Sequence, residues 1–303
     1  MYKRQRYNKL NEYYRNKFGE RVLKICVDGG FTCPNRDGSK GIGGCAFCST
    51  MGSGDLIKFR DIREQIVRHL GGYRGQRADK FIVFFQSYSN TYSDIDTLRQ
   101  KYNNVFVDDR IIGISIATRP DCINIEVVRL LQEIATKHYV MVELGLQVAD
   151  DNILDSMNVQ YHVADFKKAV TMLNEAGIDV VAHIIVGLPG ERKESIDRTI
   201  ALVNQYNIAG VKIHNLYVAK GTVIEKMYSA GTYKPLTLDE YLDRLEYIIT
   251  RLKPEIVIHR ISGDSPKDLL IAPDWDSHKK LVLNGIERNM KLHGTTQGCY
   301  YKK

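Results

Sequence analysis

Short apolar runs alternate with stretches of helical periodicity along most of this 303-residue chain. The runs have the length of buried strands, and they are too continuous for strands with one solvated face. Strands that alternate with helices predict a parallel sheet covered by helices. The predicted strands occupy residues 22–27, 81–85, 111–116, 139–144, 180–186 and 211–213. The predicted helices occupy residues 60–71, 94–103, 124–137, 163–176 and 193–206.

Six β–α repeats make an open or closed barrel, in which functional residues gather at the carboxyl ends of the strands. The unusual polar motifs of this chain all follow predicted strands, at residues 29–48, 86–91, 118–121, 147, 187–191 and 214–215. We therefore expect an α/β barrel with its chemistry at one end.

Three of the six cysteines lie in the glycine-rich segment 29–48, after the first predicted strand: Cys33, Cys45 and Cys48. A cytosolic chain keeps cysteines reduced, so clustering indicates a metal centre rather than disulfides. The two-residue gap between Cys45 and Cys48 lets both thiolates reach one centre. The eleven residues after Cys33 form a loop that returns the third thiolate. Its glycines allow the backbone to wrap closely around an inorganic core.

Two kinds of metal centre fit these thiolates. A structural zinc ion takes four ligands in closed tetrahedral geometry, and Cys26 is the available fourth cysteine. However, Cys26 belongs to the apolar run 22–27, where a free cysteine usually packs in the core. A [4Fe–4S] cluster held by three cysteines leaves one iron open for a further ligand. The third cysteine and the glycine-rich loop favour the cluster, and a four-cysteine zinc site is the alternative.

The positive charge of the chain is concentrated at its two ends. Lys plus Arg is 43 and Asp plus Glu is 36, which gives a net charge of +7. Residues 1–24 carry +6, residues 278–303 carry +5, and the middle of the chain carries −4. Basic residues interleaved with tyrosines, as in the N-terminal segment, neutralise phosphates and stack on bases. The alternative is a solvated amphipathic helix whose tyrosines pack on the body.

The composition excludes several classes of protein. With 44% hydrophobic and 26% charged residues, the chain is neither disordered nor of low complexity. No apolar run approaches the roughly 20 residues that span a membrane. The charged N-terminus is not followed by the apolar segment of a signal peptide. We therefore expect a cytoplasmic protein with no membrane partner.

The cysteine loop and the strand-end motifs resemble those of the radical S-adenosylmethionine (SAM) superfamily. The common spacing there is C-x3-C-x2-C, and this chain has C-x11-C-x2-C. The longer spacing, with the motifs at 118–121, 143–147 and 187–191, is similar to the radical SAM half of the Elongator catalytic subunit. Residues 28–38 and 86–92 narrow the resemblance to the YtqA/YhcC-type family. It implies a partial (β/α)6 TIM-type barrel at 21–270, a basic N-terminal extension at 1–20, and a basic helix and tail at 271–303.

The resemblance implies a [4Fe–4S] cluster and SAM as cofactors. Cys33, Cys45 and Cys48 would ligate the cluster, and its open iron would bind the amino and carboxylate groups of SAM. One electron would cleave SAM to methionine and a 5′-deoxyadenosyl radical, which abstracts hydrogen from the substrate. An electron donor such as flavodoxin or ferredoxin is implied as a partner.

Further residues match SAM-contacting positions of the family. They are Gln86, Ser87, Thr118, Arg119, Gln147, His183, Gly187 and Pro189. The pair after the second strand would hold the methionine end, residues 147 and 183 would contact the ribose, and the turn at 187–190 would back the adenine. This chain departs from the family pattern at two places: Gln86-Ser87 replaces a Gly-Gly-Glu motif, and Ala117 replaces the glutamate of the Elongator pattern.

Structural interpretations compete with several of these roles. His183, on an apolar strand, is more often a satisfied core residue. Arg119 and Asp121 form either a cofactor site or a structural ion pair. The turn at 187–190 is also what a chain needs before a helix. Cys299 is either a mobile catalytic thiol or a residue of a poorly ordered tail.

The resemblance also implies a substrate, namely tRNA. The expected reaction converts the 5-carboxymethylaminomethyl side chain of the wobble uridine to 5-aminomethyl. The basic ends would hold the RNA through Lys3, Arg4, Arg6, Lys9, Lys279, Lys280, Lys302 and Lys303. One alternative is radical SAM chemistry on a peptide or small metabolite, and another is a zinc-stabilised RNA-binding protein without catalysis.

Overall fold

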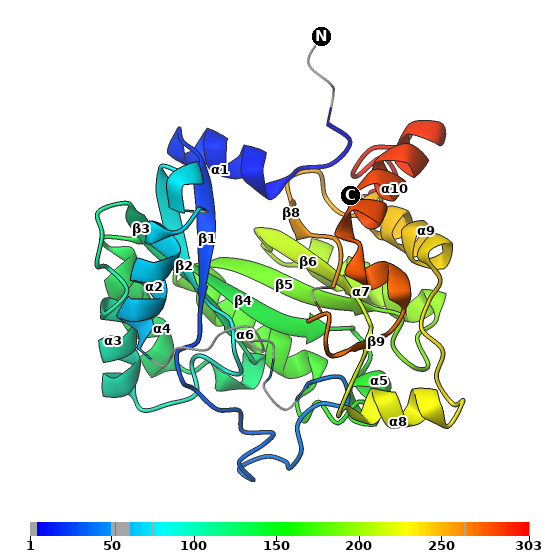
Figure 1. Ribbon diagram of the computed structural model, residues 1–303, viewed down its shortest axis with the longest axis horizontal. Helices are drawn as coiled ribbons and strands as arrows, with labels where there is room; N and C mark the ends of the chain where they lie inside the picture. Colours follow the sequence, from blue (N-terminus) through cyan, green and yellow to red (C-terminus); the bar gives the residue numbers. More distant parts are fainter. Residues whose placement is uncertain (1–4, 50–51, 53–60, 74, 264, 303) are drawn as a thin grey trace.

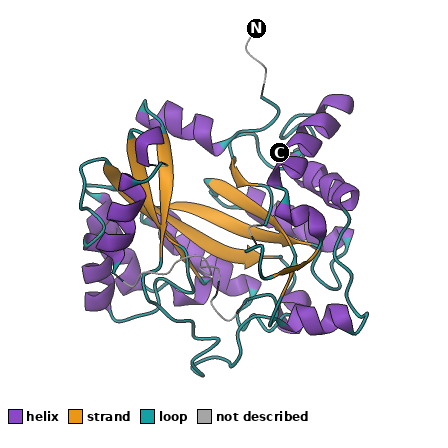
Figure 2. Ribbon diagram, in the orientation of Figure 1, coloured by secondary structure: helices purple, strands orange, loops and turns teal. Residues whose placement is uncertain are grey.

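The computed structural model describes residues 5–49, 52, 61–73, 75–263 and 265–302. Its centre is a curled sheet of seven parallel strands in the order β1-β2-β3-β4-β5-β6-β8 (Figure 2). The strands are β1 (Val22–Val27), β2 (Lys80–Phe85), β3 (Ile111–Thr118), β4 (Tyr139–Gln147), β5 (Asp179–Val186), β6 (Gly210–Asn215) and β8 (Val257–Arg260). The expected partial α/β barrel is confirmed, and the structure adds β8 to the six predicted strands.

Helices cover one face of this sheet (Figure 1). They are α2 (Ile62–Gly71), α3 (Ile95–Asn103), α4 (Ile125–Ala135), α6 (Val163–Glu175), α7 (Lys193–Gln205) and α9 (Leu238–Ile249). Four of them begin at a residue whose side-chain oxygen accepts a hydrogen bond from a backbone N–H of the first turn: Asp61, Asp94, Asn124 and Thr237. These caps satisfy amide groups that have no partner within the helix, and they fix where each helix begins.

The two faces of the sheet differ in chemistry. Val127 and Leu131 of α4 belong to the same buried cluster as Val142 and Leu144 of β4, so the helix-covered face forms the apolar core. Side chains alternate across a strand, and the residues between those of the core therefore point to the concave face. That face carries Lys24, Cys26, Ser115, Glu143, His183, Lys212 and His214.

Smaller elements complete the chain. The short strands β7 (Val218–Ala219) and β9 (Leu270–Ala272) form an antiparallel pair. Two short helices, α5 (Asp151–Ser156) and α8 (Val223–Ser229), lie near the carboxyl ends of the strands. Three turns of 3-10 helix are η1 (Gly75–Arg77), η2 (Pro120–Cys122) and η3 (Asp274–Ser277). No helix in the described ranges is both long and apolar enough to cross a bilayer.

The two ends of the chain pack together. The helix α1 (Leu10–Phe18) contacts both β1 and β8, and α10 (Lys279–Leu292) packs on α9. Gln297 joins the ends, because its backbone N–H donates to the Arg6 carbonyl at 2.8 Å and its side-chain oxygen accepts from the Asn8 N–H at 2.8 Å. In Figure 1 this region lies at the opposite end of the molecule from the loop that follows β1.

Candidate active site

The cysteine loop after β1 folds back on itself and docks on the segment 157–161. The Gly44 N–H donates to the Asn35 carbonyl at 2.8 Å, and the Asn158 side chain donates to the Gly44 carbonyl at 2.8 Å. A side chain at Gly41 would collide with the Asn35 side-chain oxygen, at 2.2 Å from an added Cβ. Gly44 has φ of 80°, which favours glycine. The glycines therefore permit the close wrapping that the sequence predicts.

The thiols of this loop lie among cations and hydrogen-bond donors. A hydrogen bond from the Cys48 thiol lowers the pKa of Cys45 against the effect of burial, and Arg119, Asn35 and Arg36 lower it further. The same hydrogen bond and burial raise the pKa of Cys48. The amide nitrogen of Asn35 lies 3.6 Å from the Cys45 sulfur. The cations and the amide donor around Cys45 favour its thiolate form, and they suit an anionic metal cluster.

The described residues contain no group of three or more His, Cys, Asp or Glu side chains that converges on a single metal ion. An iron–sulfur cluster fills the space between its thiolates, so its ligands need not converge on one point. The cations around the loop and its glycine-permitted turns fit such a cluster.

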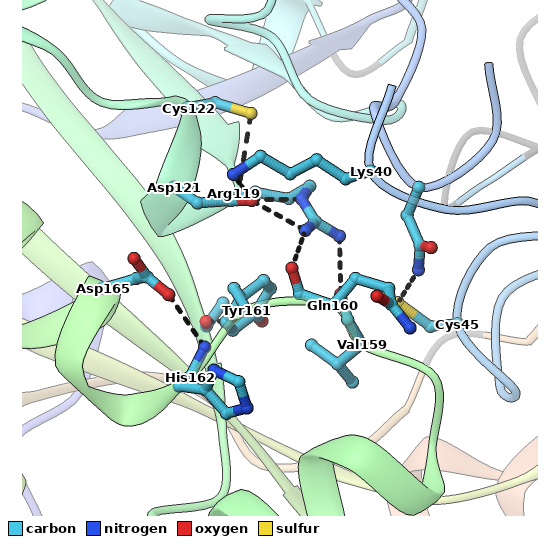
Figure 3. Close-up of polar contacts among 12 residues, drawn as sticks. Lys40, Cys45, Arg119, Asp121, Cys122, Val159, Gln160, Tyr161, His162 and Asp165 are labelled. Atoms are coloured by element: carbon cyan, nitrogen blue, oxygen red, sulfur yellow. Dashed lines mark hydrogen bonds and ion pairs between the residues drawn. The ribbon is translucent and has the colours of Figure 1, made fainter. Parts of the chain in front are cut away.

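Arg119 and its partner Asp121 connect the end of β3, the segment 157–161 and the cysteine loop (Figure 3). Its guanidinium donates to both carboxylate oxygens of Asp121 at 2.9 Å, which confirms the ion pair. It also donates to the carbonyls of Val159 at 2.8 Å and Gln160 at 3.1 Å, in the segment on which the cysteine loop docks. Lys40 of the cysteine loop reaches Asp121 at 2.7 Å. Because Arg119 is buried, this network fixes the loop against the end of β3.

The segment after β2 lies directly against the cysteine loop. The Ser89 N–H donates to the Thr32 carbonyl at 3.1 Å, and the hydroxyls of Tyr92 and Ser39 are 2.6 Å apart. The hydroxyls of Ser87 and Ser89 are buried without a hydrogen-bond partner among the described residues. Buried hydroxyls are normally paired, so these two are suited to a bound polar ligand.

Other residues predicted to contact SAM differ in their surroundings. The Thr118 hydroxyl is 2.6 Å from that of Thr91, in a buried contact. Gln147 has a left-handed backbone, with φ of 62°, and its side chain donates to the Tyr161 hydroxyl at 3.4 Å. The ring of Tyr161 lies 4.8 Å from the Arg119 guanidinium. Gln147 is thus joined through Tyr161 to Arg119, which fixes the cysteine loop.

The turn after β5 is stabilised by hydrogen bonds from its backbone to two side chains. The Gly187 N–H donates to the Glu191 carboxylate at 2.8 Å, and the Gly187 carbonyl accepts from the Tyr233 hydroxyl at 3.0 Å. Glu191 is buried and pairs with Arg244 at 2.7 Å. The left-handed φ of 92° at Gly187 explains the glycine. Pro189 lies in the same turn, which leads into α7.

His183 belongs to a separate group of charges on the concave face. Its ring nitrogen Nε2 lies 2.7 Å from a Glu143 oxygen, and Lys24 and Lys212 bind the same carboxylate. The roles of Lys24, Glu143 and Lys212 were not predicted from the sequence. A signal was present, because each is a charged residue within an otherwise apolar strand.

The prediction that Cys26 packs in the core is wrong. Cys26 is exposed on the concave face, because the alternation along β1 directs it away from the helices.

Cys299 is exposed in the C-terminal segment. The neighbouring Gly298 N–H donates to the Ile249 carbonyl at the end of α9, and the Cys299 N–H donates to the Thr296 carbonyl. No hydrogen bond or ion pair among the described residues joins Cys299 to the cysteine loop, so its position gives no support to a catalytic role.

Comparison with known proteins identifies the class. The family model "Radical SAM superfamily" matches residues 33–203, beginning at the first loop cysteine, and "Radical_SAM C-terminal domain" matches residues 208–292. The chain belongs to the radical SAM superfamily and, within it, to the YtqA/YhcC-type family that the sequence predicts. It is a radical SAM enzyme, and its cofactors are a [4Fe–4S] cluster and SAM.

Two related proteins and one solved structure show how far the similarity extends along the chain. The chain is 37% identical to "Uncharacterized protein YtqA" of Bacillus subtilis, covering 99% of this chain and 94% of that protein. It is 29% identical to the "tRNA uridine(34) acetyltransferase" of Dehalococcoides mccartyi, over 61% of this chain and 40% of that protein. The solved structure of Methanocaldococcus infernus Elp3 has a TM-score of 0.69 at 18% identity, over 91% of this chain and 64% of that one. The structural match shows the fold.

Proposed function

We propose that this radical SAM enzyme modifies the wobble uridine of tRNA and converts its 5-carboxymethylaminomethyl side chain to 5-aminomethyl. The observation that carries the proposal is the similarity of the barrel to a protein named tRNA uridine(34) acetyltransferase. The Elongator-like motifs at residues 118–121, 143–147 and 187–191 lie within the radical SAM match.

Cys33, Cys45 and Cys48 would hold the cluster at the carboxyl end of β1. When bound, the cluster and SAM supply a 5′-deoxyadenosyl radical that takes a hydrogen atom from the substrate. Ser87 and Gln86 are proposed to hold the methionine end of SAM, and the buried unpartnered hydroxyl of Ser87 supports this.

The remaining SAM contacts are proposed from residues of β3, β4 and β5 and from the turn that follows β5. Gln147 and His183 would contact the ribose, and the turn with Gly187 and Pro189 would back the adenine. Thr118 and Arg119 would act from the end of β3. Arg119 is already engaged with Asp121 and two carbonyls, so we propose that it positions the cysteine loop.

The conversion requires a two-electron oxidation followed by hydrolysis. Loss of one hydrogen atom, and then of one electron and one proton, turns the N–CH2 bond of the carboxymethyl group into an imine. Water adds to the imine and the C–N bond breaks, which releases the 5-aminomethyl product and glyoxylate. SAM would be the net oxidant: its conversion to methionine and 5′-deoxyadenosine takes up two electrons and one proton, and the electron released as the imine forms would replace the one that starts SAM cleavage.

We propose that the basic ends bind tRNA, with flavodoxin or ferredoxin as the electron donor in the cytoplasm. Lys279, Lys280 and Lys302 are exposed. Arg6 instead donates to the Thr295 carbonyl at 2.9 Å, and Lys9 pairs with Glu287. Lys3, Arg4 and Lys303 lie outside the described residues. Contacts to phosphates release counterions, so tRNA binding should weaken steeply as salt rises.

The test is a profile of modified nucleosides in tRNA from a strain without this gene. We expect the 5-carboxymethylaminomethyl nucleoside to accumulate and the 5-aminomethyl nucleoside to disappear. Complementation with Cys122→Ala should restore the profile, whereas Cys45→Ala should not. An unchanged wobble-uridine profile in the deletion strain would contradict the proposed substrate, whatever the protein does to SAM.

A further inference from the structure

The concave face of the sheet holds a group of charged residues of which only His183 is among the proposed cofactor contacts. Glu143 of β4 lies at its centre and is fully buried. One carboxylate oxygen accepts from Lys24 of β1 and from the Ser115 hydroxyl of β3, both at 2.6 Å. The other binds Lys212 of β6 and lies 2.7 Å from the His183 ring nitrogen. Four strands therefore converge on one carboxylate.

The sheet curls enough for its two sides to meet at this point. The Phe84 ring on β2 lies 5.1 Å from the Lys24 ammonium and 4.1 Å from the Lys212 ammonium. Lys212 thus reaches from β6 across the concave face to β2. The two ammonium groups flank a single aromatic ring, which attracts cations.

The charges in this group do not balance. Glu143 is the one carboxylate bonded to either Lys24 or Lys212 in the part of the chain that the structure describes. Burial lowers the pKa of His183, which favours its neutral form. Two ammonium groups therefore share one negative charge, and both of its oxygens are already occupied. Buried charges are normally paired, so this site has an excess of positive charge that suits an anion.

The pKa of Lys212 is consistent with an excess of positive charge around Glu143. Burial, together with the nearby charges of Lys24 and Arg260, lowers the pKa of Lys212 to about 8, although Glu143 opposes the shift. A second anion beside Lys212 would offset both the desolvation of its ammonium group and the repulsion by Lys24 and Arg260.

We propose that Lys24 and Lys212 form a carboxylate-binding subsite that takes the free carboxylate of the substrate side chain. This inference rests on the proposed function, because the 5-carboxymethylaminomethyl group is the substrate group that carries a carboxylate. The carbon to be oxidised is bonded directly to that carboxylate. Anchoring the carboxylate on the concave face fixes the position of this carbon, and such positioning lowers the barrier to reaction.

Cys26 provides a chemical reporter of the subsite. It lies two residues after Lys24 on the same face of β1, and its side chain is exposed. Although the Cys26 side chain is accessible, the surrounding concave face partly desolvates its thiol and raises its pKa, whereas the positive charges of Lys212, Arg260 and Lys24 lower that pKa in part. An anionic reagent drawn to those charges would therefore meet a thiol beside them.

The first experiment compares iodoacetate with iodoacetamide on the anaerobic, cluster-loaded protein. The two reagents differ by one negative charge, and peptide mass spectrometry gives the ratio of their products at each cysteine. Cys299, which is also exposed, serves as the reference thiol. We expect the iodoacetate preference at Cys26 to exceed that at Cys299 roughly tenfold, since clefts of one charge concentrate counterions by about this factor or more. Equal preferences at the two cysteines would overturn the subsite.

Substitutions identify the charges responsible. Lys212→Met should reduce the iodoacetate preference at Cys26 to that at Cys299, while Glu143 keeps Lys24 and His183 as partners. Lys24→Met is the second variant, and Lys168→Met, exposed on α6, is the matched control. A preference that survives both Lys24→Met and Lys212→Met would overturn the assignment to these residues. The wild-type ratio is informative even where a variant fails to fold.

The second experiment separates the subsite from the proposed function. The probes are tRNA that carries the 5-carboxymethylaminomethyl wobble group and the same tRNA with 5-aminomethyl. We expect the first to protect Cys26 from iodoacetamide more than the second does, and Lys212→Met to abolish this difference. A strong iodoacetate preference without any difference between the tRNAs would support the anion subsite and contradict the proposed substrate.

Discussion

Arg119 binds Asp121 through two parallel hydrogen bonds of 2.9 Å, and the same guanidinium holds the carbonyls of Val159 and Gln160. Lysine keeps the charge but cannot form this planar fork. Arg119→Lys should therefore cost about 2 kcal/mol of unfolding free energy, through buried groups left without a partner.

The same variant should bind less cluster, because the segment 157–161 would no longer be fixed under the cysteine loop. The measurements are urea unfolding and iron content after anaerobic reconstitution. Arg99→Lys is the matched control, since Arg99 pairs with Glu133 on the exposed surface. Equal iron content in wild type and Arg119→Lys would show that the network does not position the loop.

Glu143 should be among the most sensitive positions of the barrel. Glu143→Gln removes the charge that compensates Lys24 and Lys212, and leaving buried charges unpaired typically costs about 3–5 kcal/mol. Burial alone would raise the pKa of Glu143, but Lys212, Lys24 and His183 hold it well below its usual range. The stabilisation is thus present near neutral pH and is lost as the pH falls through that lowered pKa.

Urea unfolding at neutral pH checks this prediction. Glu133→Gln, at an exposed ion pair, should leave the midpoint nearly unchanged. A midpoint for Glu143→Gln equal to that of the control would mean that the buried cluster does not stabilise the fold.

The sequence predicts most of the sheet because its strands are continuous apolar runs. It does not predict β8, in which two polar residues, His259 and Arg260, follow only a short apolar stretch. β8 nevertheless joins the sheet because its backbone pairs with β6. Tertiary pairing of this kind leaves no periodic signal in the strand itself.

The same limit applies to the site. Cys33, Cys45 and Cys48 lie within one short segment, so their ability to reach a common metal centre can be predicted from their spacing in the sequence. The docking of the loop on residues 157–161 depends on a contact between segments more than 100 residues apart, such as that of Asn35 with the Asn158 carbonyl. The wrong prediction for Cys26 has a simpler cause. An apolar run in the sequence does not indicate which face of its strand is covered by helices.

The three loop cysteines should be separable from the others by spectroscopy. Alanine at Cys33, Cys45 or Cys48 removes one thiolate, and we expect the charge-transfer absorbance of the reconstituted cluster to fall below one tenth of the wild-type value. Burial raises the pKa of Cys122 to about 12, so this thiol is protonated at neutral pH and is a poor ligand. Cys122→Ala and Cys26→Ala should retain the full absorbance. Loss of the cluster in either would redefine the ligand set.

The pH dependence of turnover should report on Lys212. The groups that interact with it electrostatically are Glu143, Lys24, Arg260, Cys26, His183, His214 and His259. With a pKa of about 8 in the free enzyme, Lys212 loses its charge above that pH, and kcat/KM for tRNA should fall up to tenfold per pH unit. Lys212→Arg should move this fall to higher pH, since arginine stays charged.

Loss of the Lys212 charge does not itself destabilise the fold, because the contribution of Lys212 to stability changes in the opposite direction from turnover. The pKa of Lys212 is lowered from its ordinary value of 10.5. Between pH 8 and that value the unfolded chain binds more protons than the folded one, so the contribution of Lys212 to the unfolding free energy rises with pH. The measurement is kcat/KM between pH 6.5 and 9.5 alongside thermal unfolding in the same buffers. A flat profile, or one that is identical in Lys212→Arg, would show that the charge of Lys212 does not bind the substrate.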